Sequence, residues 1–425
     1  LGGLAVVYTF SGGGKAVGHA HTLQFLIILA AMSLAFALVL RALPAGMGFA
    51  DAWLLAGRSG RLNAVQLHFD PNDRYNLWSG LIGGFFLQLS YFGTDQSQVG
   101  RYLSGQSVRE SRMGLLFNGL FKIPMQFGIL LLGVMVFVFH LFAPSPLFFN
   151  PLEQARVANG AQGREWSALE QRHDALREQT SAAASALVRA HRVHDANAES
   201  AAAERLSDAE RANRQLRAEA ARLVHSADPQ AQSSDTNYIF LSFVLHVLPA
   251  GVVGLVLAAI FAAAMNSSCA ELSALTSTTV VDVIRRLRPA VAEAPPPDGV
   301  REVWTSRFVT LGWAAFAVLF AEYASRLGSL IEAVNILGSL FYGTMLGIFL
   351  TAFYLRHVGG RAVFVAGLIG EACVLLCFRF SHISFLWYNL VGALVVMVVA
   401  LLLAALERRP APGTGSRAGG APSRP

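Results

Sequence analysis

Long apolar runs limit the fold of this chain more than any other feature of its sequence. A run of about 18 or more apolar residues is long enough to cross a bilayer as a helix. Small residues such as Gly343 and Gly347 within these runs favour close packing of helices in lipid. We predict eight membrane spans, at residues 22–43, 76–98, 114–143, 249–283, 303–323, 329–356, 361–380 and 383–405.

The composition supports a membrane protein and excludes several other classes. Hydrophobic residues make up 54% of the 425 residues and charged residues 14%, against about 25% charged in soluble domains. A soluble enzyme and a disordered chain are therefore excluded, and three cysteines are too few for a secreted disulfide scaffold. The net charge of +6 requires no nucleic-acid partner, because membrane proteins concentrate Lys and Arg in their cytoplasmic loops.

One hydrophilic insertion interrupts the apolar pattern. It holds 11 Arg and 13 acidic residues between positions 151 and 236, and it lacks Pro and Gly from Arg164 to Asp228. We predict two helices there, at 164–192 and 197–226. The chain is thus predicted to comprise a membrane region at 1–149, a helical-hairpin insertion at 150–236, a second membrane region at 237–408 and a disordered tail at 409–425.

The distribution of basic residues predicts an orientation. Twelve Lys and Arg residues lie in the short loops of one side and five in those of the other. The richer side is expected to be cytoplasmic, which places both ends inside and the insertion outside. The insertion is typical of a solvated hairpin. A partner-binding coiled coil is the alternative, although its heptads are weak.

Ionisable and amide groups near the spans are candidates for function, because burying them in lipid costs free energy. Asp95 and Gln96 lie at a predicted inner helix end, as an interfacial cap or as part of a cation or substrate site. Lys122 is an interfacial lysine, a donor to a polar solute or a surrogate for a cation. Glu332 and Asn335 are three residues apart, so they share a helix face and can line a cavity.

Hydroxyl groups crowd the second half of the span at 249–283. Uncharged oxygen ligands suit a hard monovalent cation, but Ser and Thr also pack helices together, and the sequence leaves both interpretations open. No phosphate loop, zinc motif or nucleophile elbow is present, so no enzyme activity is predicted. The hydroxyl residues, which follow Asn266, are Ser267, Ser268, Ser273, Thr276, Ser277, Thr278 and Thr279.

Three motifs in this order resemble the sodium:solute symporter family, which includes the sodium/glucose cotransporters. The first runs from Tyr8 to Val17 and resembles the loop before core helix 5 of that family. The second, from Tyr91 to Leu103 (YFGTDQSQVGRYL), resembles the family signature, and the third, from Ala264 to Asp282, resembles core helix 8. The similarity extends over nearly all of the chain except the insertion and the tail.

The resemblance implies an all-α integral membrane fold of the leucine-transporter type. Two inverted five-helix repeats surround a site at the membrane midplane in this fold. Span 22–43 corresponds to core helix 5, and spans 76–98 to 329–356 correspond to core helices 6 to 10. We therefore expect an N-terminally truncated bundle that lacks the counterparts of core helices 1 to 4, with two peripheral helices at its end.

The resemblance also implies a substrate site. Tyr91 corresponds to the inner-gate tyrosine beneath the substrate, and Gln88 falls one turn earlier, where a sugar-contacting amide lies. Lys122 corresponds to the substrate-contacting lysine of core helix 7, and Asn335 falls near the amide contact of core helix 10.

A sodium site is implied at Ala263, Asn266 and Ser267. The family usually has hydroxyls at the last two positions, whereas this chain keeps only Ser267. An amide oxygen can also coordinate sodium, with altered geometry. In addition, Ala20-His21 stands before Gln24 where the family has a Thr-Asp pair associated with cation coupling.

We therefore expect a secondary active transporter that couples sodium to the symport of a small polar organic solute. It is expected in the cytoplasmic membrane, in contact with lipid, with sodium as coupling ion, no other cofactor and no nucleic-acid partner. The alternatives are a proton-coupled or uncoupled facilitator, and a non-transporting membrane protein whose outer hairpin binds a partner.

Overall fold

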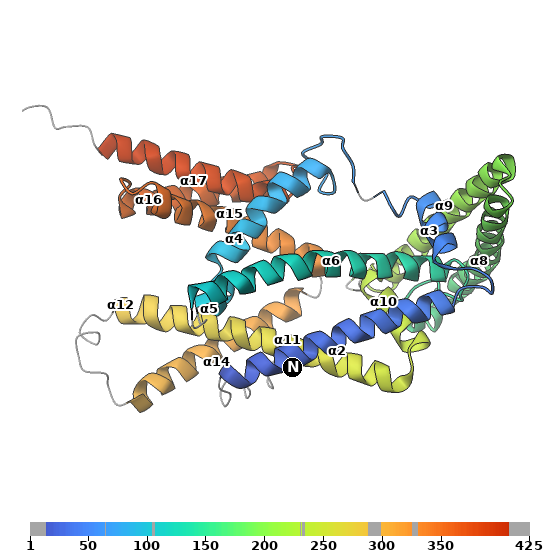
Figure 1. Ribbon diagram of the computed structural model, residues 1–425, viewed down its shortest axis with the longest axis horizontal. Coiled ribbons are helices and arrows are strands. Elements are labelled where there is room, and N and C mark those ends of the chain that lie inside the picture. The colour runs from blue at the N-terminus through green and yellow to red at the C-terminus, as the bar shows by residue number, and fades with distance from the viewer. Residues whose placement is uncertain are drawn as a thin grey trace, which may run out of the picture. The chain divides into compact units, whose positions relative to one another are not determined.

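The computed structural model describes residues 14–63, 65–103, 107–229, 231, 234–287, 299–324 and 330–407. Within these residues all regular secondary structure is helical (Figure 1), apart from one isolated β bridge between Gln66 and Asn76. The predicted all-α class is confirmed. The predicted disordered tail at 409–425 lies outside the described residues, as does most of the motif from Tyr8 to Val17.

Seven helices in the described part of the chain are long and apolar enough to cross a membrane. They correspond to seven of the eight predicted spans. Their bounds are Thr22–Arg41, Val108–His140, Ala250–Leu287, Val303–Glu322, Val334–Tyr354, Gly360–Phe380 and Leu386–Glu407.

The remaining predicted span, 76–98, differs from the other seven. It consists of a π-helix, η1 Ser79–Gly83, followed by α4 Gly84–Thr94, and the backbone becomes extended at Asp95. The polar residues Gln88 and Ser90 interrupt its apolar surface. This helix is therefore shorter and more polar than the sequence pattern indicated.

Packing divides the chain into two compact units, which are described separately. Unit 1 comprises residues 1–64 and 100–333, and unit 2 comprises residues 65–99 and 334–425. The units group helices by their contacts, whereas the predicted regions followed hydropathy along the chain.

Unit 2 holds η1, α4, most of α15 Leu330–Tyr354 and all of α16 Gly360–Phe380 and α17 Leu386–Glu407. Helices α15 and α17 touch at glycines. A Cβ atom on Gly343 would lie 2.6 Å from the Asn389 carbonyl oxygen, and one on Gly392 would lie 2.8 Å from the Thr344 nitrogen. Asn389, which is fully buried, donates a hydrogen bond to Ser339 Oγ at 3.0 Å. Small residues thus permit the close approach that the sequence predicted.

Unit 1 is built around α11 and α6. Helix α11 packs against α2 and α14, and α6 packs against α2. Helix α11 continues through a second π-helix, η2 Thr279–Ile284, into the short α12 Arg285–Leu287. This unit includes the helices α2 Gly14–Arg41, α6 Val108–His140, α10 Thr236–Val247, α11 Ala250–Thr278 and α14 Gly299–Ala324, while α5 Gln96–Leu103 belongs to both units.

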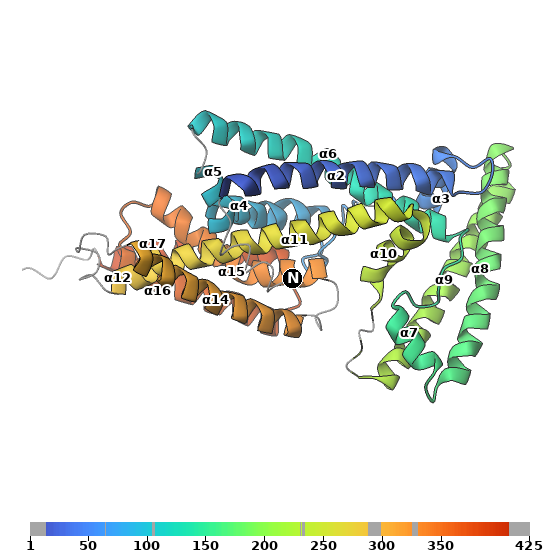
Figure 2. The same ribbon diagram turned by 90° about the horizontal axis from the view of Figure 1, so that it is seen from below.

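The hydrophilic insertion forms two antiparallel helices, α8 Gly163–Arg192 and α9 Ala196–Ala227, close to the two predicted helices (Figure 2). The chain reverses at His194, whose φ of 56° lies in the left-handed region. Asp195 then caps α9, because its side chain accepts hydrogen bonds from the backbone amides of Asn197 and Ala198. The short helix α7 Pro151–Ala158 packs against both helices.

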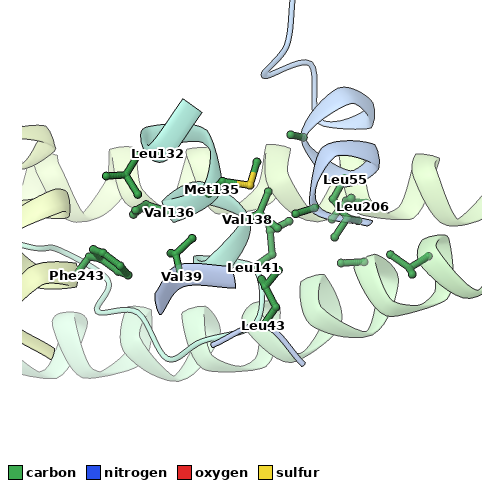
Figure 3. Packing of buried hydrophobic residues seen from close by; sticks show 14 of the residues in the cluster. Val39, Leu43, Leu55, Leu132, Met135, Val136, Val138, Leu141, Leu206 and Phe243 are labelled. Atoms are coloured by element: carbon green, nitrogen blue, oxygen red, sulfur yellow. The ribbon is translucent and has the colours of Figure 1, made fainter. Parts of the chain in front are cut away.

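One face of this hairpin is buried against the ends of the apolar helices of unit 1 (Figure 3). The contacts come from α2, α6 and α10, and also from the short helix α3 Phe49–Arg58. The hairpin is therefore solvated on its outer face only. We call this cluster the hairpin core, and its members include Val39, Leu43, Leu55, Leu132, Met135, Val138, Leu187, Leu206 and Phe243.

Ion pairs at the tip of the hairpin add to this packing. Arg192 contacts Asp51 of α3 at 2.8 Å, and Arg58 of α3 pairs with Glu199 of α9. Burial raises the pKa of Asp51, but the hydrogen bonds from Arg192 and from the Gly48 amide outweigh it and hold the pKa below its usual value. The tip is thus fixed to α3 by charge as well as by apolar contact.

The hairpin core predicts that Leu206→Ala loosens the hairpin. Leu206 is 1% exposed, and truncating a buried leucine costs about 2–5 kcal/mol. Limited trypsin digestion should cleave the Arg-rich helices of the variant sooner than those of the wild type. Val193→Ala is the control, because Val193 lies at the turn and is 73% exposed. Equal digestion rates for the two variants would contradict the packing.

Candidate functional site

The predicted sodium ligands lie on α11, on the part of the helix that packs near α2. Asn266 is 4% exposed, and its Nδ2 donates a hydrogen bond to Gln24 Oε1 of α2 at 2.9 Å. Ala263 is half-buried and Ser267 is exposed. The bond to Gln24 uses the amide nitrogen, so the atom that a cation would contact, Oδ1, is not the atom that holds Asn266 in place.

Hydroxyl groups in the second half of α11 bond within their own helix or reach α14. Ser268 and Ser273 donate to backbone carbonyls of the preceding turn, at 2.9 and 2.7 Å. The hydroxyl oxygens of Thr276 and Thr310 of α14 are 2.9 Å apart. Thr279 accepts a hydrogen bond from the indole nitrogen of Trp313, which also belongs to α14. These contacts support the helix-packing interpretation for this stretch and join α11 to α14.

A polar cluster occupies the junction of α4 and α5 in unit 2. Gln98 donates to the Tyr91 hydroxyl at 2.8 Å, and the Tyr342 hydroxyl of α15 donates to Asp95 Oδ2 at 3.3 Å. The rings of Tyr91 and Tyr342 are 6.3 Å apart between centroids. The motif from Tyr91 to Leu103 thus brings its tyrosine and its aspartate into contact with Tyr342 of α15.

Asp95 also organises the start of α5. Its Oδ1 accepts hydrogen bonds from the Ser97 amide at 2.9 Å and from the Ser97 hydroxyl at 2.6 Å, as a residue that caps a helix does. The capping interpretation of Asp95 accordingly matches its contacts. The second carboxylate oxygen connects this cap to Tyr342.

The other predicted residues are more dispersed. Gln88 is exposed on α4, and Gln96 is exposed at the start of α5. Lys122 is exposed on α6 in unit 1, and Asn335 is half-buried on α15. Glu332 belongs to α15, but its side chain lies outside the described residues.

Tyr342 is the residue of this cluster that sequence reasoning missed. It sits in an apolar helix, and no local pattern distinguishes it from a tyrosine that packs against lipid. Its partners, Ser90 and Asp95, are about 250 positions away, at separations of 252 and 247 residues. Gln24 was noted for its neighbours, but its contact with Asn266 was not predicted.

The fold resembles that of a solved sodium symporter. A structure titled as the substrate-bound, outward-open state of a Na⁺-coupled sialic acid symporter matches with a TM-score of 0.63. The match covers 95% of this chain and 65% of the other chain, at 18% sequence identity. The fold is therefore of the leucine-transporter type, as predicted.

Sequence comparison shows similarity to one family over part of the chain. The sequence model of the sodium:solute symporter family matches residues 214–370, the segment that contains the third motif, and confirms the resemblance to this family. The human sodium/iodide cotransporter is 30% identical over 139 residues, which is 32% of this chain and 21% of that protein. The sodium/sialic acid symporter NanT of Aliivibrio fischeri is 25% identical over 175 residues, 41% of this chain and 34% of that protein.

The chain spans about a fifth to a third of the curated relatives that it matches.

The geometry of α11 predicts how two substitutions alter sodium binding. Asn266→Ser restores a hydroxyl and removes two amide donors that repel a cation, so it should lower the sodium concentration needed for half-saturation. Ser267→Ala removes a ligand and should raise that concentration, by roughly tenfold for one hydrogen-bond-strength contact to a charge. Thermal unfolding in detergent, titrated with NaCl against choline chloride, measures the effect because a bound ion stabilises the folded state.

Ser268→Ala is the matched control for these variants. Ser268 is the next hydroxyl along α11, and it donates to the Ala264 carbonyl. Its removal should leave the sodium titration unchanged. If Asn266→Ser and Ser267→Ala behave like this control, α11 holds no sodium site, and Asn266 serves only to join α11 to α2.

Proposed function

We propose that this chain belongs to a secondary active transporter that couples sodium to the symport of a small polar organic solute. The match of the family model to residues 214–370 carries the proposal. That segment contains all of α11 and all of α15, where we expect the sodium ligands and one solute contact. We propose no catalytic role for the chain.

Sodium is the proposed coupling ion, with the Ala263 carbonyl, the Asn266 amide oxygen and the Ser267 hydroxyl as ligands. A hard cation prefers such oxygens. Because Asn266 is also bonded to Gln24, a cation on its oxygen would act on an amide that already joins α11 to α2. Sodium would thereby favour one arrangement of these two helices, which is the differential binding that a coupled transporter requires.

The proposed solute contacts are Gln88, Tyr91, Lys122 and Asn335. In support, Tyr91 already belongs to a hydrogen-bonded cluster that reaches a second helix through its ring contact with Tyr342. The position of a gate residue changes with the conformation of the bundle. Such a residue therefore needs contacts that hold it in place in each conformation. Asp95, Gln96 and Glu332 remain further candidates for this site.

Sodium-driven uptake tests the proposal. The product of the complete gene, reconstituted into proteoliposomes, should accumulate a solute from a labelled panel faster under an inward sodium gradient than under an equal choline gradient. Iodide and sialic acid belong in the panel because the relatives are named for them. Uptake that ignores sodium but follows a proton gradient would favour a proton-coupled carrier. Uptake that needs neither gradient would favour a facilitator.

We further propose that the protein spans the cytoplasmic membrane, among lipids and without nucleic acid, with both ends inside and the hairpin outside. The multi-pass character is given by the seven apolar helices. The orientation rests on the unequal distribution of basic residues between the two sets of loops.

Cysteine labelling tests this orientation. Ser200 is exposed on α9, and Arg286 is exposed beyond the far end of α11. In a background with Cys269, Cys373 and Cys377 replaced by alanine, Ser200→Cys should react with an impermeant thiol reagent in intact spheroplasts. Arg286→Cys, the matched control, should react only after lysis. The reverse pattern would contradict the proposed orientation.

A further inference from the structure

A cavity of about 600 Å³ lies where the hairpin meets the ends of α6 and α10. All of its walls belong to unit 1. The predicted sodium ligands and solute contacts are not among its lining residues, so it is separate from the site proposed above. Cavities of roughly 300–1,000 Å³ are typical of small-molecule sites.

Positive charge exceeds negative charge in the cavity wall. The lining includes four arginines but only two carboxylates, Glu210 and Asp235. Asp235 accepts two hydrogen bonds from Arg217, at 2.8 and 2.9 Å. Glu210 accepts one from Ser59 Oγ at 2.5 Å. The other three arginines of the wall are Arg61, Arg177 and Arg214.

The remaining ionisable residues of the wall add little to this balance. Burial, assisted by the nearby Arg217, lowers the pKa of His173, so its imidazole is neutral at pH 7. The Arg61 guanidinium lies over the Phe137 ring, 4.3 Å from its centroid. Arg177 and Arg214, on the two helices of the hairpin, form ion pairs with Asp174 and Glu210, each at 3.7 Å. Both ion pairs are longer than hydrogen bonds, and the four arginines of the wall outnumber these two carboxylates and Asp235.

Several buried polar atoms of the wall have no hydrogen-bond partner within the described part of the chain. They are Arg177 Nε, Asn213 Oδ1 and both ring nitrogens of His140. Leaving buried polar groups unpaired costs free energy, so each needs an explanation. Arg177 supplies a donor, Asn213 an acceptor, and a neutral imidazole supplies one of each. A ligand that both accepts and donates hydrogen bonds would satisfy them.

Another part of the cavity lining is apolar. Leu130, Val134 and Phe137 of α6 form it, together with Ile239 of α10. A ligand that fills the cavity would bury an apolar part against these side chains and direct its polar part toward α8 and α9. The two parts of the lining thus select an amphipathic molecule over a simple inorganic anion.

We propose that this cavity binds a small organic anion whose carboxylate and adjacent hydroxyl are carried on an apolar body. The carboxylate pairs with Arg177 and Arg214, the hydroxyl donates to Asn213 Oδ1, and the apolar body packs against α6. The proposal goes beyond sodium-coupled symport and does not depend on it.

Calorimetric titration of the full chain in detergent, without sodium, tests the ligand class. Mandelate has a carboxylate, an adjacent hydroxyl and a phenyl ring, and it should bind. Phenylacetate lacks the hydroxyl and should bind several-fold more weakly, whereas mandelamide lacks the charge and should not bind measurably. Equal binding of mandelate and mandelamide, or no binding of mandelate, would overturn the proposal and leave water as the occupant.

Two variants assign the residues. Arg177→Gln should weaken the binding of mandelate and of phenylacetate alike, by about tenfold to a hundredfold, as expected for a hydrogen-bonded charge pair. Asn213→Ala should weaken the binding of mandelate only, so that mandelate and phenylacetate bind with equal affinity. Arg211→Gln on α9 is the control, because Arg211 pairs with Asp208 and does not line the cavity.

Circular dichroism and gel filtration should show that the variants remain folded. If Arg177→Gln does not fold, the loss of the mandelate preference in Asn213→Ala still decides the case. Unchanged affinities in a folded variant would overturn the proposal. Competition of mandelate by vesicles of phosphatidylglycerol, but not of phosphatidylcholine, would show that the cavity takes a lipid headgroup and would likewise overturn it.

Discussion

Lipid cannot hydrogen-bond with a protein, and the rest of this structure depends on that constraint. A polar side chain that is buried among apolar helices must find its partner inside the protein. Asn266 meets this need through Gln24, Asn389 through Ser339, and Asp95 through Tyr342. Such pairs fix which helices touch and in what register, because an amide or a carboxylate can bond only where its partner lies.

The hairpin obeys the same rule at the end of the apolar helices. There the apolar surface of α2, α6 and α10 would meet water, and the hairpin core covers it. The polar outer face of the hairpin then carries most of its charged residues. Burial on one side and ion pairs such as Arg192 with Asp51 at the tip hold an insertion that is mostly Ala, Glu and Arg in a single position.

Much of the secondary structure could be predicted from the sequence. Apolar runs located seven spans, and the absence of Pro and Gly located α8 and α9. These signals are local, so they need no knowledge of the fold. The docking of the hairpin and the part played by Tyr342 could not be predicted, because both arise between residues far apart in the chain. Leu187 and Leu206 are sparse apolar points in a polar sequence, and only the packed structure shows that they are buried.

The π-helix η1 has a consequence for the register of the helix that follows it. A π-turn accommodates one more residue than an α-turn while the flanking helices keep their directions. Without it, an extra residue would rotate everything downstream by about 100°, turning Tyr91 and Asp95 away from α15. Loss of one residue within Ser79–Gly83 would therefore convert the turn to ordinary helix and leave that cluster in place. Loss of one residue within α4 would rotate that cluster away from α15. Length variation is therefore tolerated before Gly84 and excluded after it.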